Sequence, residues 1–114
     1  MAKTVLVVDD IPFARQVIKE ILLAAKYNVV GEAENGVQAV ELFGKYKPNL
    51  VPMDIVMPKK GGIEATREIM ELEKSAKVLI ISAMAHEHLL MDAVNAGVRD
   101  YLLKPFQPED LLRA

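Results

Sequence analysis

The sequence predicts an α/β fold in which one doubly wound, five-stranded parallel sheet is covered by helices on both faces. Short apolar runs alternate with amphipathic segments five times along the chain, a pattern typical of βα units that build a parallel sheet. The runs VLVV and VLII are apolar throughout, as expected of strands buried on both faces. The 114 residues, 52% hydrophobic and 26% charged, suit one folded domain spanning residues 1–114.

The N-terminal half of the chain contains two predicted strands and two predicted helices. A β-branched run predicts the first strand at Thr4–Val8. Apolar residues at helical spacing after a proline predict a helix at Pro12–Ala25. A second short strand follows at Asn28–Gly31. Asn35 is a good N-cap for the next helix, with Gln38 as its capping-box partner.

The C-terminal half repeats the alternation three times. The third strand is expected at Leu50–Asp54 and is followed by a helix ending at Leu72 that begins at Ile63, after a glycine pair. A fourth strand at Val78–Ser82 precedes a helix at His86–Ala96, whose Val94 we place on the inward face. The remaining elements are a strand at Asp100–Leu103 and a helix that starts at Pro108.

Composition and charge exclude several classes of protein. The net charge of −2 and the pI near 5.7 argue against a direct nucleic-acid surface, which needs a basic stripe. The chain has no cysteine, so disulfides and thiolate metal sites are excluded. No apolar run is long enough to span a membrane, and the N-terminus turns acidic too soon for a signal peptide. We therefore expect a cytoplasmic protein with no membrane partner.

Polar side chains stand where the predicted strands end. Asp9 and Asp10 follow the first strand, Asp54 ends the third, Ser82 ends the fourth and Lys104 follows the fifth. Parallel strands bring these groups to one edge of the sheet, where three carboxylates repel one another. Mg²⁺ would relieve that repulsion. A carboxylate left free could attack phosphorus, with Lys104 as a point charge on the phosphoryl oxygens.

Four motifs carry a resemblance to a known family. VLVVDD, MDIVMP, ISA and YLLKPF, in this order and spacing, closely resemble bacterial two-component response-regulator receiver domains. The resemblance covers nearly the whole chain and is strongest to the single-domain chemotaxis regulators, through DDIPFAR and ISAM. It implies the flavodoxin-like strand order 2-1-3-4-5.

The resemblance also implies a role for individual residues. Asp54 corresponds to the phosphoacceptor, and it shares Mg²⁺ with Asp9, Asp10 and the backbone carbonyl of Val56. The other positions carried over are Ser82 as the switch hydroxyl, Tyr101 as the aromatic switch, Lys104 as the phosphate-binding lysine, and Lys104–Pro105 as a cis peptide bond.

These roles imply a signalling switch rather than an enzyme, although the domain would catalyse its own Mg²⁺-dependent phosphorylation and dephosphorylation. The implied phosphoryl donor is a phosphohistidine on a sensor histidine kinase. A flagellar motor switch protein and a phosphatase are further expected partners. The fourth helix, fifth strand and fifth helix form the usual output face.

Several alternatives remain open from the sequence alone. Asp9 and Asp10 could cap the first helix. The domain could be the receiver of a transcription factor or a methylesterase, or a pseudo-receiver that is not phosphorylated. A small Mg²⁺ phosphatase is disfavoured because its general acid would fall at Val56. We interpret His86 and His88, two residues apart, as solvated.

Two departures from the family pattern lead to further hypotheses. Pro52 stands in a strand that is central in this topology, where its missing N–H would open the ladder locally or force a bulge. Val56 and Met84 lie two residues after Asp54 and Ser82, and their apolar side chains cannot orient the water that hydrolyses an acyl phosphate. We therefore expect slow self-dephosphorylation.

Overall fold

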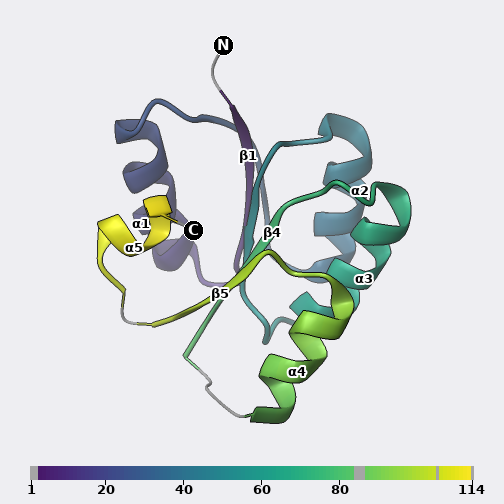
Figure 1. Cartoon of the computed structure of the whole chain (residues 1–114). Helices are drawn as coiled ribbons and strands as arrows, with labels where there is room; N and C mark the ends of the chain where they lie inside the picture. The colour runs from purple at the N-terminus through teal and green to yellow at the C-terminus, as the bar shows by residue number, and fades with distance from the viewer. Residues whose placement is uncertain (1–2, 84–86, 105, 114) are drawn as a thin grey trace.

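In the part of the chain that the structure describes, five strands alternate with five helices (Figure 1). The computed structural model describes residues 3–83, 87–104 and 106–113. The strands are β1 Thr4–Val8, β2 Asn28–Ala33, β3 Val51–Met53, β4 Val78–Ser82 and β5 Asp100–Leu103; the helices are α1 Pro12–Ala24, α2 Gly36–Tyr46, α3 Gly62–Leu72, α4 Glu87–Ala96 and α5 Pro108–Arg113. All strand pairs are parallel, in the order β2-β1-β3-β4-β5. The predicted fold class and strand order are confirmed.

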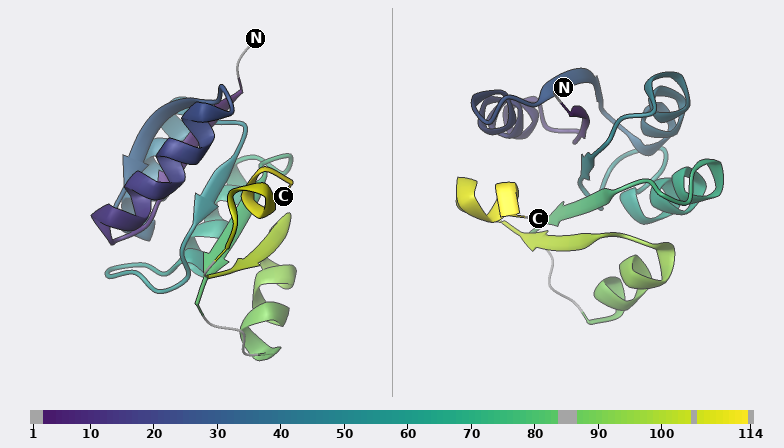
Figure 2. Two further views of the ribbon diagram at one scale, coloured as in Figure 1. Left: turned by 90° about the vertical axis from the view of Figure 1, so that its left-hand side faces the viewer. Right: turned by 45° about the horizontal axis from the view of Figure 1, so that its top comes forward.

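Helices cover both faces of the sheet (Figure 2), and an apolar cluster lies on each face. On one face, Ile18 and Leu22 of α1 and Leu111 of α5 pack on alternate residues of the strands. On the other face, the buried residues of α2, α3 and α4 pack on the remaining strand residues, with Phe43 and Ile69 among the largest. No helix of the described ranges combines the length and hydrophobicity needed to cross a membrane.

Most predicted bounds coincide with the observed ones, and the others differ by one or two residues. The strand β2 continues to Ala33 because it pairs with β1 as far as Val8, and α2 begins after the predicted cap, where Asn35 accepts a hydrogen bond from the Gln38 N–H at 2.9 Å. The inward placement of Val94 was wrong. Its side chain is 64% exposed, because α4 packs on the core through Ala93 and Ala96 instead.

The region around Pro52 shows how the sheet accommodates a proline in its central strand. The N–H groups of Leu50 and Asp54 donate to the carbonyls of Thr4 and Val8 on β1, at 3.1 Å each. Residue 52 lies between these donors, so a ladder without proline would place its N–H against the Leu6 carbonyl.

The interruption is confined to the pairing of β3 with β1. That pairing consists of Val8↔Met53 and an isolated bridge, whereas β3 pairs with β4 in regular register at all three residues, including Pro52↔Leu79. Of the two hypotheses, local opening of the ladder therefore describes β3 and a bulge does not. Because the ladder resumes at Asp54, the strand end is held in place despite the proline.

Candidate functional site

The predicted acidic cluster forms at the carboxyl edge of the sheet. Asp9 and Asp10 follow β1, and Asp54 follows the adjacent strand β3. One carboxylate oxygen of each residue lies within 4.8 Å of the other two. Three residues from two strand ends thus meet at one point, as the parallel arrangement requires.

Every polar group of Asp9 takes part in a hydrogen bond or ion pair. The residue is only 1% exposed. Its N–H donates to the Ala33 carbonyl at 3.1 Å, and its carboxylate accepts from the Ile11 N–H at 3.0 Å and from Lys104 Nζ at 3.2 Å. Its backbone carbonyl accepts from Arg15 at 2.8 Å. Helix α1 has Ile11 as its N-cap residue, with no side-chain cap, so the capping alternative does not hold.

Asp54 is a buried carboxylate, and the positive charge near it does not offset the effects of its burial and of the two neighbouring carboxylates. Its Oδ1 accepts the Ile55 N–H at 2.8 Å, and its Oδ2 lies 3.8 Å from Lys104 Nζ. Burial raises the pKa of Asp54, and the neighbouring charges of Asp9 and Asp10 raise it further, while Lys104 and the Ile55 N–H act in the opposite direction. The anionic form of this carboxylate is therefore held in an unfavourable environment.

The donor set fits a magnesium ion. Three carboxylates face one lysine, Lys104, which pairs with both Asp9 and Asp54, so the four side chains carry a net charge of −2 when all are ionised. Oxygens around an octahedral Mg²⁺ stand about 3 Å apart when adjacent and about 4.2 Å when opposite. One oxygen from each of the three residues lies within 4.8 Å of the other two, close to that range. The contribution of the Val56 carbonyl stays a prediction; the Val56 side chain is 55% exposed in the loop beyond β3.

The remaining predicted site residues lie on β4 and β5. Ser82 is buried at the end of β4, and its carbonyl accepts the Lys104 N–H at 2.9 Å. Tyr101 is half-buried in β5, opposite Ile80 and packed against the cluster under α2, α3 and α4. Their switching roles stay predictions. Residues Met84, His86 and Pro105, including the Lys104–Pro105 peptide bond, fall outside the described residues, and His88 is exposed on α4.

Two glycines set the path of the loop that follows Asp54. A Cβ added to Gly62 would stand 2.1 Å from the Asp54 carbonyl oxygen, and one added to Gly36 would stand 2.4 Å from the carbonyl oxygen of Lys60. The Gly62 N–H donates to the Ile55 carbonyl at 2.8 Å, and the Gly36 N–H donates to Lys60 at 2.9 Å. The start of α3 is thus packed directly against the backbone of the candidate phosphoacceptor.

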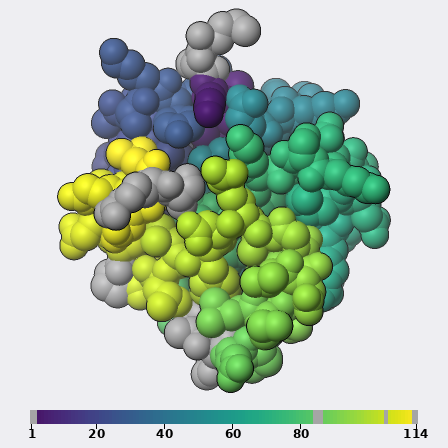
Figure 3. Space-filling model, viewed as in Figure 1, coloured from purple at the N-terminus to yellow at the C-terminus, as the bar shows by residue number. Residues whose placement is uncertain are grey.

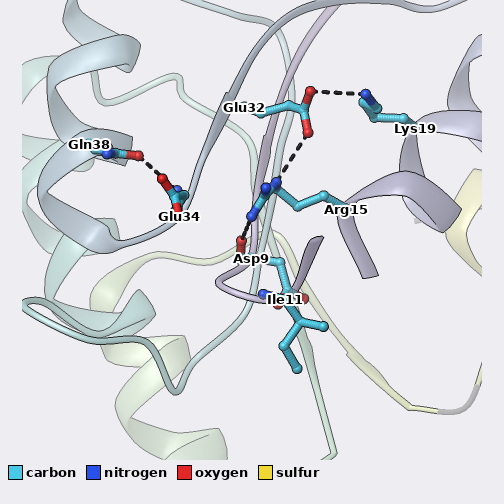
Figure 4. Close-up of polar contacts among 7 residues, drawn as sticks. All are labelled: Asp9, Ile11, Arg15, Lys19, Glu32, Glu34 and Gln38. Carbon is cyan, nitrogen blue, oxygen red and sulfur yellow. Dashed lines mark hydrogen bonds and ion pairs between the residues drawn. The ribbon is translucent and has the colours of Figure 1, made fainter. Parts of the chain in front are cut away.

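Neither the close approaches of Gly36 and Gly62 nor the contact between Arg15 and Asp9 was predicted from the sequence. The glycine pair signalled a turn, but nothing in the sequence pattern shows which backbone atoms the loop meets. Arg15 has the ordinary appearance of a solvated residue in the first turns of a helix. Figure 4 shows its side chain lying between Asp9 and Glu32 instead.

Comparison with known proteins gives consistent matches. Residues 5–114 match the family described as response regulator receiver domain. The chain is 45% identical to the chemotaxis protein CheY of Thermotoga maritima over 114 residues, which cover 100% of this chain and 95% of that protein. It is 38% identical to the nitrate/nitrite response regulator protein NarL of Escherichia coli K12, over 97% of this chain and 52% of NarL.

Solved structures agree with the sequence matches. The structure of the CheX-CheY-BeF3-Mg complex from Borrelia burgdorferi aligns with a TM-score of 0.94 at 32% identity, covering 97% of this chain and 84% of that chain. The response regulator domain of Thermotoga maritima CheB aligns with a TM-score of 0.91 at 34% identity, covering 99% and 92%.

Proposed function

The chain belongs to the response regulator receiver domain family, and we propose that it is a CheY-like chemotaxis switch controlled by phosphorylation of Asp54. The observation that carries this proposal is the meeting of Asp9, Asp10 and Asp54 within 4.8 Å at the sheet edge, with Lys104 against two of them. The same residue types stand where the family resemblance expects the phosphorylation site.

The proposed reaction depends on two positive charges beside Asp54, the ammonium of Lys104 and a bound magnesium ion. In its anionic form, Asp54 attacks the phosphorus of a donor with a carboxylate oxygen. A new P–O bond forms, and the bond between phosphorus and the donor breaks with its electron pair leaving on the donor. Lys104 lies 3.8 Å from Asp54 Oδ2, close enough to place its ammonium on the transferred phosphoryl oxygens. Magnesium, when bound, supplies further positive charge for those oxygens.

The proposed response is a shift between two conformations. Ser82 is buried at the strand end next to Asp54, and Tyr101 is half-buried in the neighbouring strand. A hydroxyl that binds the phosphoryl group would favour the conformation in which Tyr101 turns inward. Phosphorylation would then change a pre-existing equilibrium rather than create a new state.

The proposed output surface consists of α4, β5 and α5. Figure 3 shows these elements together on one face of the molecule. Exposed apolar side chains of these elements include Met91, Val94 and Leu103, which suit a protein partner more than a solvated surface.

The proposed partners are a sensor histidine kinase as phosphoryl donor, a flagellar motor switch protein and a phosphatase. Two findings support this choice. The curated relatives that share 45% identity are chemotaxis proteins, and one solved relative is a complex of CheX with CheY. We place this signalling in the cytoplasm, and we propose no enzymatic activity on a separate substrate.

A second candidate is the receiver of a larger regulator. The matches to NarL at 38% identity and to the CheB receiver at 34% identity favour a transcription factor or a methylesterase as the larger protein. The sequence of the gene beyond residue 114 distinguishes this candidate from the chemotaxis switch.

Intact mass spectrometry after incubation with acetyl phosphate and Mg²⁺ tests the proposal. The wild-type protein should gain one phosphoryl group, and this gain should disappear with EDTA and in Asp54→Asn. Asp92→Asn is the matched control, because Asp92 is an exposed carboxylate on α4, and this variant should be labelled like the wild type. A folded wild-type protein that gains no phosphoryl group would instead be a pseudo-receiver.

A further inference from the structure

The guanidinium of Arg15 connects the acidic cluster to strand β2. Its Nη1 donates to the backbone carbonyl of Asp9 at 2.8 Å, and its Nε donates to Glu32 Oε1 at 3.1 Å (Figure 4). The side chain is 15% exposed, so it is held along the surface of the fold rather than extended into solvent. Both hydrogen bonds involve a charged group and are stronger than neutral ones.

The carbonyl that Arg15 binds belongs to the peptide unit between two candidate metal ligands. This unit is planar and includes the Cα atoms of both Asp9 and Asp10. Fixing the carbonyl oxygen therefore fixes the rotation of the whole plane. Because both side chains branch from this plane, its rotation decides how the Asp9 and Asp10 carboxylates stand relative to each other.

Glu32 holds Arg15 in the required position. It lies on β2, where it pairs with Val7. Its second oxygen accepts from Lys19 at 2.9 Å. The Lys19 hydrogen bond is the largest cause of the lowered pKa of Glu32, and the Arg15 hydrogen bond also lowers it. Glu32 thus stays anionic at neutral pH and keeps the guanidinium oriented.

The contact with Arg15 is compatible with metal binding, unlike the contact with Lys104. Lys104 pairs with the Asp9 carboxylate itself, at 3.2 Å, and so competes with a cation for that group. Arg15 contacts Asp9 only through its backbone carbonyl. Its effect on the carboxylates therefore persists when a metal ion replaces the lysine.

We propose that Arg15 is a positioning residue for magnesium, which pre-orients the Asp9 and Asp10 carboxylates through their shared peptide plane. The proposal rests on the phosphorylation function proposed above, because it concerns the metal of that same site. For the removal of Arg15, the proposal predicts a change in Mg²⁺ affinity opposite in sign to the change expected from charge alone. Removing a positive charge near a cation site should strengthen Mg²⁺ binding, whereas loss of pre-orientation should weaken it.

The test is isothermal titration calorimetry of the unphosphorylated full chain with MgCl₂. In Arg15→Ala, the dissociation constant for Mg²⁺ should rise roughly 10-fold, the lower end of the range for lost outer-shell hydrogen bonds. Lys19→Ala is the matched control, because it also removes one positive charge and one hydrogen bond to Glu32 but leaves the Asp9 contact intact. Its dissociation constant should stay within about twofold of the wild-type value.

A conservative variant and a kinetic readout separate positioning from a general structural role. In Arg15→Lys, one ammonium cannot reach Asp9 and Glu32 with the same fork of donors, so Mg²⁺ affinity should be intermediate. The rate of phosphorylation by acetyl phosphate in Arg15→Ala should recover to the wild-type rate at saturating Mg²⁺. Far-UV circular dichroism at the titration temperature establishes that each variant is folded.

The possible outcomes are distinct. Unchanged or tighter Mg²⁺ binding in folded Arg15→Ala overturns the positioning role, as does equal weakening in Lys19→Ala or a phosphorylation rate that stays low at saturating Mg²⁺. In each of these cases a wild-type protein that binds Mg²⁺ and is phosphorylated leaves the proposed function standing. A wild-type protein that binds no Mg²⁺ overturns both.

Discussion

Replacement of Gly62 by alanine should damage both the stability of the domain and its phosphorylation. The added Cβ would lie 2.1 Å from the Asp54 carbonyl oxygen and 3.1 Å from the Ile55 Cα. Favourable contacts between nonbonded heavy atoms lie near 3.5 Å. The first turn of α3 and the end of β3 must therefore separate by roughly 1 Å or more, a backbone shift of the kind that overpacking forces. The obstructing atoms are backbone atoms, which cannot rotate away as a side chain would.

The magnitude follows from two contributions. Overpacking of a closely packed site costs about 1–3 kcal/mol. Separating the two segments also lengthens the 2.8 Å hydrogen bond from the Gly62 N–H to the Ile55 carbonyl, which contributes about 0.5–1.5 kcal/mol. The free energy of unfolding should therefore fall by roughly 2–4 kcal/mol, which lowers Tm by about 8–16 °C for a domain of this size.

Gly44→Ala provides a matched control with the opposite sign. Gly44 lies within α2, and a Cβ added there meets nothing within 4 Å. Alanine is favoured over glycine inside a helix by about 0.5–1 kcal/mol, so this variant should melt about 2–4 °C higher than the wild type.

The assay combines thermal melting, followed by circular dichroism, with the intact-mass measurement of phosphorylation. Gly62→Ala should be phosphorylated more slowly even at a temperature at which it is folded, because the carbonyl displaced belongs to Asp54, the proposed phosphoacceptor. Gly44→Ala should be phosphorylated like the wild type. A Gly62→Ala protein that melts and reacts like the wild type would refute the packing argument.

Three further perturbations have definite expected outcomes. Pro52→Val restores a donor for the Leu6 carbonyl, worth about 0.5–1.5 kcal/mol, but loses about 0.4–1 kcal/mol from proline's restriction of the unfolded chain; the midpoints leave about 0.3 kcal/mol, so Tm should rise by about 1 °C with phosphorylation retained, and a lower Tm would contradict this. Asp54→Asn should raise Tm at pH 7 in EDTA, because burial raises the pKa of Asp54 in the folded state. This advantage should shrink as the pH falls through that pKa and vanish below about pH 4, where both states are protonated; a pH-independent difference would exclude this cause. Val56→Asn should hydrolyse its acyl phosphate roughly 2- to 13-fold faster than the wild type, for which we expect slow hydrolysis, if one hydrogen bond holds the attacking water; a wild-type phosphoryl lifetime of seconds would contradict the expectation.

The sequence predicts that these side chains meet because their meeting depends on topology. Asp9, Asp54 and Lys104 are far apart in the chain, yet each follows a strand, and parallel strands bring their carboxyl ends to one edge. Hydrophobic periodicity is enough to identify the strands. The meeting of the three side chains then follows from the order of the strands rather than from any detail of packing.

The features that could not be predicted depend on distances between segments. Val94 satisfies helical periodicity, but small residues of α4 make the contact with the core, and only the packing of the helix shows this. Gly62 signals a turn without revealing the carbonyl against which it packs. The reach of Arg15 depends on the separation of α1 from β2. Such contacts are specific to tertiary structure and leave no period in the sequence.

Because Lys104 pairs with two carboxylates, it can couple phosphorylation of Asp54 to metal binding. One ammonium pairs with both Asp9 and Asp54, and it is the only lysine that the described residues place in ion pairs with the acidic cluster. A phosphoryl group on Asp54 would carry more negative charge than the carboxylate it modifies, and so would draw Lys104 away from Asp9. The Asp9 carboxylate would then lose its ion pair with Lys104, and a metal ion could take the place of the ammonium. Phosphorylation and metal binding should therefore strengthen each other, and by linkage the coupling is the same in both directions.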